Sequence, residues 1–242
     1  MTENNNFKMG LRDGLPICLG YFAVSFAFGI FAVSSGLSIL EAVLISAFNL
    51  TSAGQIAAVP IIACGGGLIE LALSQLVINS RYALMSVSLS QRLGGSVKTA
   101  DRFLIAYANT DEIFAVSVSK EQPVGRKFMF GLILPPFLGW TLGTLLGAFA
   151  GNILPAILVC ALEIAIYAMF IAIVVPAAKD SGKVAVASLL AVGLSCVFYF
   201  VEPIKEHLSK FSIIIIAVAV SAFMALVAPI PDEDGTEEES DA

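Results

Sequence analysis

The sequence predicts an all-α polytopic membrane protein, and three observations predict it. The composition lies outside that of a soluble domain, with 58% apolar residues, 13% charged residues and a mean hydropathy of +0.91. Long apolar segments follow one another along all but the last part of the 242 residues. Because a spanning helix needs about 20 apolar residues, the chain has room for roughly six to eight crossings and for no separate soluble domain.

Two regions of unequal size are expected. Residues 1–230 form a single transmembrane domain, and residues 231–242 form an acidic tail that carries most of the formal charge of −6. A block of like charges is usually solvated and disordered, which is the structure expected for this tail; a regulatory acidic tail is the alternative.

Eight apolar segments can be traced, and two of them have polar centres. The segments lie near residues 15–35, 40–63, 68–90, 103–119, 127–151, 155–177, 184–202 and 211–229. The second is interrupted at residues 51–55 and the fourth at residues 109–112. Each interruption predicts a broken helix.

The charges of the loops suggest how these broken segments enter the membrane. Lys and Arg in short loops favour the cytoplasm, so Lys8 and Arg12 place the N-terminus inside. If both broken segments crossed fully, the loop that holds Arg92, Lys98 and Arg102 would lie outside; if both enter and return on one side, this loop is inside. We therefore expect about six transmembrane helices, two re-entrant segments and both termini in the cytoplasm. The alternative is full crossing of one or both segments, in seven or eight spans.

In the preferred topology the two breaks enter from opposite sides, which is the arrangement that an inverted repeat produces. A broken helix inside a membrane frees backbone polar groups, and these persist only where protein or a water-filled cavity satisfies them. The first break, with Thr51, Ser52, Gly54 and Gln55, is therefore a candidate binding site; a polar patch for helix packing is the alternative.

Charged residues at membrane depth add to this candidate site. They are Arg81, Asp111, Glu112 and Glu163. Snorkelling to the surface is the alternative for Arg81, a solvated turn is the alternative for the two acids of the second break, and structural hydrogen bonding is the alternative for Glu163. A zwitterion could use both signs of charge. Glu163, Glu112 or Asp111, as a carboxylate in a low dielectric, could take and release a proton and so couple transport to a proton gradient.

Other patterns in the sequence bear on packing and exclude some chemistry. Gly139, Gly143, Gly147 and Gly151 recur at every fourth residue, and they predict close packing of another helix, within this chain or in a second subunit. The four cysteines show no metal-ligand spacing and the chain has one His, so no metal, no cofactor and no catalytic site are expected.

Six motifs together resemble a known family. They are GLPICLGYFAVSFAFG (14–29), GLSILEA (36–42), LTSAGQIAA (50–58), NSRYALMSVSL (79–89), NTDEIFAV (109–116) and ALEIAIYAMFIAIVVP (161–176). In this order they are similar to the AzlC/YgaZ family of branched-chain amino acid exporters. The resemblance implies a multi-pass permease in the cell inner (cytoplasmic) membrane, which moves branched-chain amino acids outward together with a small membrane subunit of the AzlD/YgaH type.

The resemblance also carries site residues onto this chain. The family's Gln-containing stretch falls on Ser52, Gly54 and Gln55, its Asn-x-Arg falls on Asn79 and Arg81, its Thr-Asp-Glu falls on Thr110, Asp111 and Glu112, and its acid of the sixth segment falls on Glu163. Tyr82 and Glu163 depart from the family pattern, which has His and Asp there. The expected partners are thus an amino acid, the small subunit and the lipid bilayer, without nucleic acid. A channel-like facilitator for another small solute is the competing class.

Overall fold

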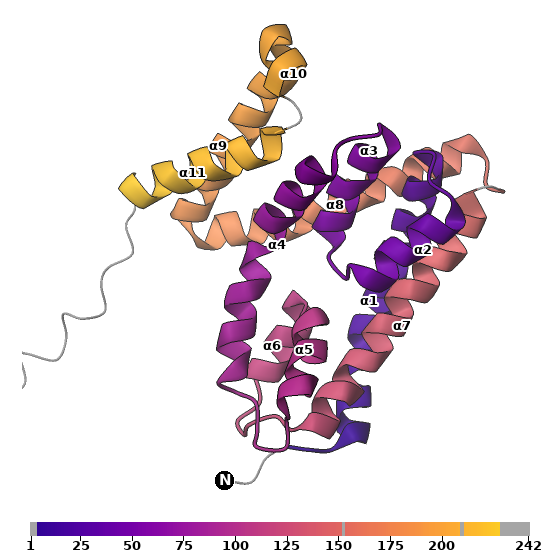
Figure 1. The fold of residues 1–242 in the computed structure, drawn as a ribbon, viewed down its shortest axis with the longest axis vertical. Helices are drawn as coiled ribbons and strands as arrows, with labels where there is room; N and C mark the ends of the chain where they lie inside the picture. Colours follow the sequence, from indigo (N-terminus) through magenta and orange to yellow (C-terminus); the bar gives the residue numbers. More distant parts are fainter. Residues whose placement is uncertain (1–3, 152, 209–210, 228–242) are drawn as a thin grey trace, which may run out of the picture. The chain divides into compact units, whose positions relative to one another are not determined.

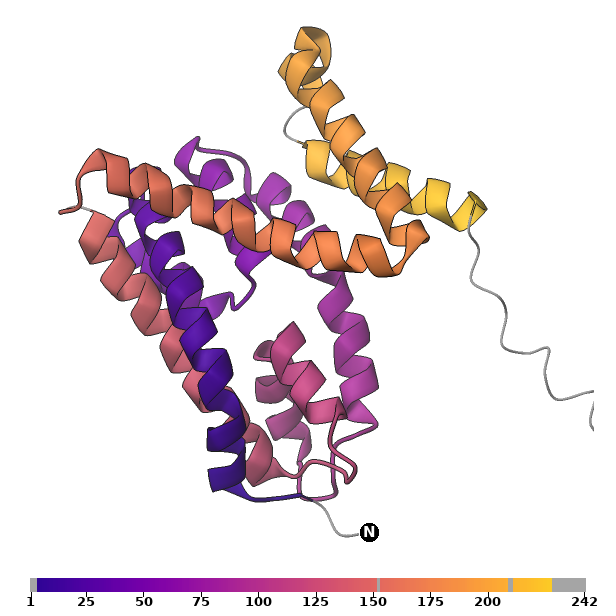
Figure 2. The same ribbon diagram turned by 180° about the vertical axis from the view of Figure 1, so that it is seen from behind.

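The computed structural model describes residues 4–151, 153–208 and 211–227, and within these ranges it is built of helices. The prediction of an all-α fold is confirmed (Figures 1 and 2). The helices are α1 (Phe7–Ser34), α2 (Ile39–Phe48), α3 (Ser52–Ala63), α4 (Leu68–Ser90), α5 (Thr99–Tyr107), α6 (Asp111–Val118), α7 (Arg126–Gly151), α8 (Ala156–Asp180), α9 (Gly182–Phe200), α10 (Glu202–Leu208) and α11 (Ser212–Val227).

Three of the described helices are long and apolar enough to cross a membrane by length and composition, namely α1, α7 and α9. The chain falls into two compact units, one ending at Met169 and the other beginning at Phe170, so the residues of α8 belong partly to each. The predicted tail at residues 231–242 lies outside the described residues.

The first unit is organised around α1 and α7, which lie side by side along their length (Figures 1 and 2). A Cβ on Gly139 would lie 2.7 Å from the carbonyl oxygen of Cys18, and one on Gly143 would lie 2.6 Å from that of Phe22. A Cβ on Gly147 would overlap the carbonyl oxygen of Phe26. Because the contacts advance in the same direction on both helices, α1 and α7 are parallel, and the missing side chains let their backbones approach.

Helices α2 and α3 form a hairpin at the C-terminal ends of α1 and α7. The hairpin begins with a capping box, in which Ser38 and Glu41 satisfy each other's backbone N–H groups. Its first arm carries Ala42 and its second arm carries Val59, and both residues pack in one cluster with Phe28 and Ala148. The two arms therefore enter and return at the same end, and residues 49–51 interrupt the helix between them.

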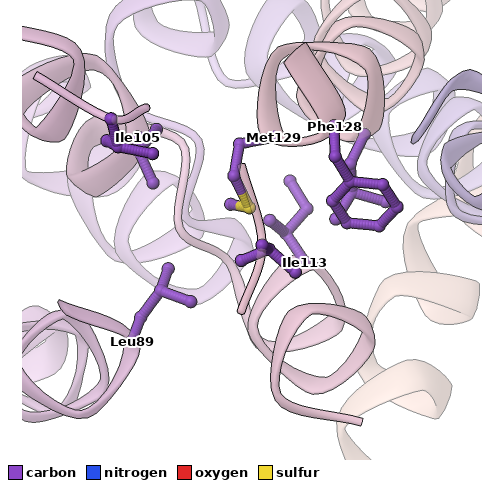
Figure 3. Packing of buried hydrophobic residues seen from close by; sticks show 8 residues of the cluster. Leu89, Ile105, Ile113, Phe128 and Met129 are labelled. Atoms are coloured by element: carbon purple, nitrogen blue, oxygen red, sulfur yellow. The ribbon is translucent and has the colours of Figure 1, made fainter. Parts of the chain in front are cut away.

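Helices α5 and α6 form a second hairpin at the opposite end of the α1 and α7 pair. Ile105 of α5 and Ile113 of α6 pack against Phe128 and Met129 in the first turn of α7, together with Leu89 at the end of α4 (Figure 3). Residues 108–110 separate the two helices. Both predicted breaks are observed, but they lie at residues 49–51 and 108–110 rather than at 51–55 and 109–112, because Ser52 and Asp111 already begin the following helices. Both broken segments are hairpins in this structure.

The first six helices repeat one order of elements. The long helix α1 is followed by the hairpin of α2 and α3, which lies at the C-terminal end of α1. The long helix α4 runs antiparallel to α1 and is followed by the hairpin of α5 and α6, which lies at the C-terminal end of α4. Since the second group is inverted relative to the first, this is the arrangement of an inverted repeat.

In the second unit, α9 and α11 pack against each other, and the short α10 follows α9. The rings of Tyr199 and Phe200 meet edge to face at a centroid distance of 4.9 Å at the end of α9. No residue of α9 or α11 that the structure describes is buried, as is usual for apolar helices whose surroundings are lipid or other protein.

Candidate functional site

The broken tips of the two hairpins meet beside the middle of α7. Leu50 of the first break, Ala108 of the second break and Trp140 of α7 form one buried cluster. The hydroxyl of Tyr107, the last residue of α5, donates a hydrogen bond to the carbonyl oxygen of Ala47 near the end of α2. Two segments that enter from opposite ends therefore bring their helix breaks to one place.

A buried chain of hydrogen bonds fastens the first hairpin to α7. The indole Nε1 of Trp140 donates to Gln55 Oε1 at 2.8 Å, and Gln55 Nε2 donates to Ser46 Oγ at 2.8 Å. Ser46 Oγ lies 2.7 Å from Thr144 Oγ1. Gln55, Ser46 and Thr144 are fully buried, and a buried amide needs such partners because it has lost its water. Gln55 therefore braces both arms of the hairpin against α7.

A second network ties the start of α3 to α4. Gln75 Nε2 donates to the carbonyl oxygen of Gly54 at 2.8 Å, while Gln75 Oε1 accepts from Asn49 Nδ2 and Asn79 Nδ2, each at 3.1 Å. Thr51 Oγ1 donates to Asn49 Oδ1 at 2.9 Å. A Cβ on Gly54 would lie 2.6 Å from Gln75 Oε1, so a larger residue at this position would displace the Gln75 amide.

The N-terminus of α3 presents its first N–H groups without a side-chain cap. Thr51 stands at the N-cap but makes no capping bond, and Ser52 is half-buried in the first turn. No acidic residue lies in that turn. The positive end of a helix dipole with unpaired N–H groups attracts an anion such as a carboxylate.

The N-terminus of α6 lies at the other tip and carries two acids. Asp111 Oδ1 accepts from Arg81 Nη1 at 2.7 Å, and Arg81 Nη2 donates to the hydroxyl of Tyr82 at 3.0 Å. The guanidinium carbon also lies 4.7 Å from the centroid of the Tyr82 ring. The side chains of Arg81 and Asp111 are about half exposed, so their ion pair links α4 to α6 without being sealed from the surroundings.

Glu112, the neighbouring acid, has a neutral partner instead. Its Oε2 accepts a hydrogen bond from the hydroxyl of Tyr21 on α1. The Tyr21 ring meets Trp140 edge to face, at a centroid distance of 5.1 Å and an interplanar angle of 69°. Among the residues that the structure describes, no cation pairs with Glu112, which contrasts with the compensated charge of Asp111.

Two amide oxygens near the tips have no donor. Asn79 Oδ1 and Asn109 Oδ1 are buried, and neither has a hydrogen-bond partner among the described residues. Asn109 Nδ2 donates to Ser86 Oγ at 3.3 Å, so this side chain is held by its amide nitrogen alone. Buried acceptors without a partner are rare in folded proteins, so these two oxygens are available to accept a hydrogen bond from a substrate.

The structure thus brings together most of the residues that the sequence singled out. Thr51, Ser52, Gly54, Gln55 and Asn79 surround the first break, and Arg81, Thr110, Asp111 and Glu112 surround the second. Glu163 belongs to α8, but its side chain lies outside the described residues. In the part of the chain that is described, no group of three or more His, Cys, Asp or Glu could hold a metal ion.

Several residues of the site were not singled out by the sequence, among them Tyr21, Ser46, Gln75 and Trp140. Two of them carried a usable signal. Gln75 precedes Asn79 by one helical turn, and Trp140 is the single Trp of the chain, set between two glycines of the regular glycine series. Tyr21 and Ser46 gave no such signal, because single hydroxyl groups are common in membrane helices.

Comparison with known proteins agrees with this architecture. The sequence model of the family described as "AzlC protein" matches residues 16–154. The chain is 30% identical over 206 residues to the "Inner membrane protein YgaZ" of Escherichia coli (strain K12), a match that covers 82% of this chain and 84% of that protein. It is 31% identical over 208 residues to an "Uncharacterized membrane protein" of Archaeoglobus fulgidus, a match that covers 80% of this chain and 91% of that protein.

No solved structure matches the chain. The family match spans α1 to α7, including both hairpins and the tips where they meet, and the two relatives extend the similarity over most of the chain. With its apolar helices and these relatives, the protein is a membrane protein that belongs to the AzlC family.

Proposed function

We propose that this protein is a secondary transporter that exports branched-chain and other hydrophobic amino acids across the cytoplasmic membrane. The observation that carries the proposal is the meeting of two half-helix N-termini, those of α3 and α6, at the tips of hairpins that enter from opposite ends. Broken helices of this kind form substrate sites in secondary transporters, because their ends supply charge without requiring a buried ion.

The two N-termini differ in a way that suits a zwitterion. The first turn of α3 offers uncapped N–H groups and no acid, and it would hold the substrate carboxylate beside Ser52 and Gly54. The other side of the site offers acceptors, namely Glu112 and the oxygens of Asn79 and Asn109, which would hold the ammonium group. An α-amino acid would thus lie with its backbone between the hairpin tips.

The walls of the site favour an apolar side chain. Around Leu50, Ala108 and Trp140 the partly buried residues are Val24, Ile133, Phe137 and Tyr21. A branched aliphatic group placed there would replace water with apolar contact, at about 0.8 kcal/mol for each buried methylene. A polar side chain of the same length would lose its hydration without gaining a partner.

The two acids of α6 suggest different roles in coupling. Asp111 is paired with Arg81, so protonation of Asp111 would leave the guanidinium without its counter-charge. Glu112 has a phenol as its partner, and protonation would remove its charge without leaving a cation alone. Glu112 is therefore our first candidate for the residue that takes and releases a proton, with Glu163 as the second.

The inverted arrangement of α1 to α3 and α4 to α6 supplies a means of exposing the site to each side in turn. Rocking of one repeat against the other around a site at their interface is the usual form of alternating access. The family membership supports a transporter-like membrane protein, and the relative named as an inner membrane protein supports a location in the cytoplasmic membrane. Export together with a small AzlD/YgaH-type subunit is proposed from the resemblance of the motifs, and cytoplasmic termini are proposed from the charges of the loops.

The test is efflux of labelled valine, leucine and isoleucine from vesicles that contain this protein and its small partner. Efflux would be measured with and without a proton gradient, for the wild type, Glu112→Gln and Glu163→Gln. We expect gradient-dependent export that Glu112→Gln uncouples or abolishes. Export that ignores the gradient in the wild type would indicate a channel-like facilitator instead. Absence of export of all three amino acids by the folded pair would refute the substrate assignment.

A further inference from the structure

A second polar site lies away from the hairpin tips, where α1 and α7 begin. It is a pocket of about 390 Å³ lined by Asn5, Phe7, Ser96, Arg126, Lys127 and Phe130. Because both helices are long and apolar enough to cross a membrane, the end at which they start lies near lipid headgroups. The residues of this pocket take no part in the proposed transport site.

Hydrogen bonds fix the polar wall of the pocket. Asn5 Oδ1 accepts from the backbone N–H of Lys127 at 2.6 Å, and Ser96 Oγ accepts from the backbone N–H of Arg126 at 2.9 Å. The chain before α1 is held to the chain before α7 by a backbone bond of 2.7 Å from Gly125 N to Asn4 O. These bonds hold the backbone at the start of α7 in place and do not use the charged ends of Arg126 and Lys127.

The pocket has an excess of positive charge. Arg126 uses Nε to contact Asp101 Oδ1 at 3.0 Å, and its side chain is still half exposed. Lys127 forms no ion pair with any carboxylate in the described ranges, and its side chain is exposed. Neither α1 nor α7 has an acid in its first turn, so the positive ends of two parallel helix dipoles add to these cations.

Other charged groups at this end do not line the pocket, and this includes the exposed Glu121 in the loop before α7. Asp13 is paired with Lys120 at 2.7 Å, and Asp101 is matched by Arg126. Lys8 adds a further positive charge in the first turn of α1. An anion that enters the pocket would therefore meet Lys127 and the remaining donors of Arg126 without a competing carboxylate among the described residues.

The apolar wall of the pocket, formed by Phe7 and Phe130, indicates which kind of anion would bind. Phe7 is 38% exposed, and Phe130 lies on the same side of α7 as Arg126, whose guanidinium carbon is 5.6 Å from the Phe130 ring centroid. A phosphate flanked by hydrocarbon would use the cations for its oxygens and the two rings for its apolar part. We infer that this pocket binds the phosphodiester headgroup of an anionic phospholipid, with the acyl chains running along α1 and α7.

The inference is tested by thermal unfolding of the full-length protein in detergent, titrated with phosphatidylglycerol, phosphatidylcholine or inorganic phosphate. We expect phosphatidylglycerol to raise the unfolding temperature at lower concentration than phosphatidylcholine. Lys127→Gln should weaken this effect by about fivefold, the change expected from one basic residue near an anionic lipid. The substitution keeps the backbone bond to Asn5, so the fold should be retained.

The control is Arg92→Gln, which removes the same charge from an exposed loop residue that does not line the pocket. It should leave the titration with phosphatidylglycerol unchanged. Equal weakening by both variants would mean that only overall charge attracts the lipid, and it would overturn the inference. Stabilisation by inorganic phosphate alone, with no added effect of the lipid, would identify a soluble anion as the ligand and would equally overturn it.

Discussion

Tyr21 of the first helix donates a hydrogen bond to the carboxylate of Glu112, a residue 91 positions later in the chain. The bond joins α1, which lies against α7, to the N-terminal turn of a half-helix. The Tyr21 ring also contacts Trp140 in an edge-to-face arrangement. Trp140 in turn donates a hydrogen bond to Gln55 of the other hairpin. These contacts therefore link four helices, and they end at a carboxylate that has no cationic partner among the described residues.

Tyr21→Phe should lower export about tenfold, because a hydrogen bond to a charged group contributes roughly 1.5 to 3 kcal/mol and Glu112 would lose its fixed position. The rate of efflux of labelled leucine from vesicles measures this effect. Tyr199→Phe removes a hydroxyl from the second unit and serves as the control, with export expected to stay at the wild-type rate. A Tyr21→Phe variant that exports at the wild-type rate would show that the hydroxyl has no part in transport.

Gly147→Ala should destabilise the protein by about 1 to 3 kcal/mol, because the added methyl group overlaps the backbone oxygen of Phe26 and forces α1 and α7 apart. The measurement is the unfolding temperature in detergent. Gly193→Ala is the matched control, since nothing lies within 4 Å of a Cβ at Gly193 in α9. There the same substitution should be neutral or stabilising by up to about 1 kcal/mol. Equal effects of the two would argue against close packing at Gly147.

Trp140→Phe should destabilise the first hairpin by about 1 to 3 kcal/mol, because Gln55 Oε1 would remain buried without its donor. Hydrogen exchange of the α2 and α3 amides, compared with those of α5 and α6, locates the loss. We expect faster exchange in the first hairpin. Unchanged protection there would mean that the amide finds another donor and that the indole bond is dispensable.

The pair Arg81 and Asp111 should show only modest coupling in stability. Both side chains are about half exposed, and ion pairs of this kind contribute roughly 0.2 to 1 kcal/mol. A double-mutant cycle with Arg81→Gln and Asp111→Asn, measured by thermal unfolding, gives the value. A coupling energy of several kcal/mol would show that the ion pair is shielded from water in the assembled protein and that it holds α4 and α6 together.

The apolar segments and their polar interruptions were enough to predict that the first unit is helical and contains two broken segments. Polar residues such as Thr51 and Asp111 cannot lie in the middle of an uninterrupted lipid-facing helix without cost, so the existence of both breaks follows from the sequence. Their bounds do not, because the polar residues that follow each break form the first turn of the next helix. The glycines at every fourth position of α7 indicated close packing, but their partner could not be read from the sequence. Small residues permit approach from any helix, and α1 is distant along the chain.

The residues of the candidate site were predicted only in part, because local sequence patterns do not show which distant helices pack together. Charged residues are easily recognised in an apolar segment, so Arg81 and Glu112 could be identified as candidates from the sequence. The position of Tyr21 beside Glu112 depends on the register of α1 against a hairpin far along the chain, and no local pattern encodes that register. Gln55 was expected to meet substrate, whereas the structure places its amide between Trp140 and Ser46.

The parallel alignment of α1 and α7 has a consequence for how the protein is made. Two neighbouring helices that run in the same direction cannot be joined by a tight turn, and here Ser25 reaches the carbonyl oxygen of Gly139 across 114 residues. Because helices insert in the order of synthesis, α1 enters the membrane long before its packing surface exists. Two hairpins and α4 must be accommodated first, so the main interface of the first unit closes only once α7 has left the ribosome.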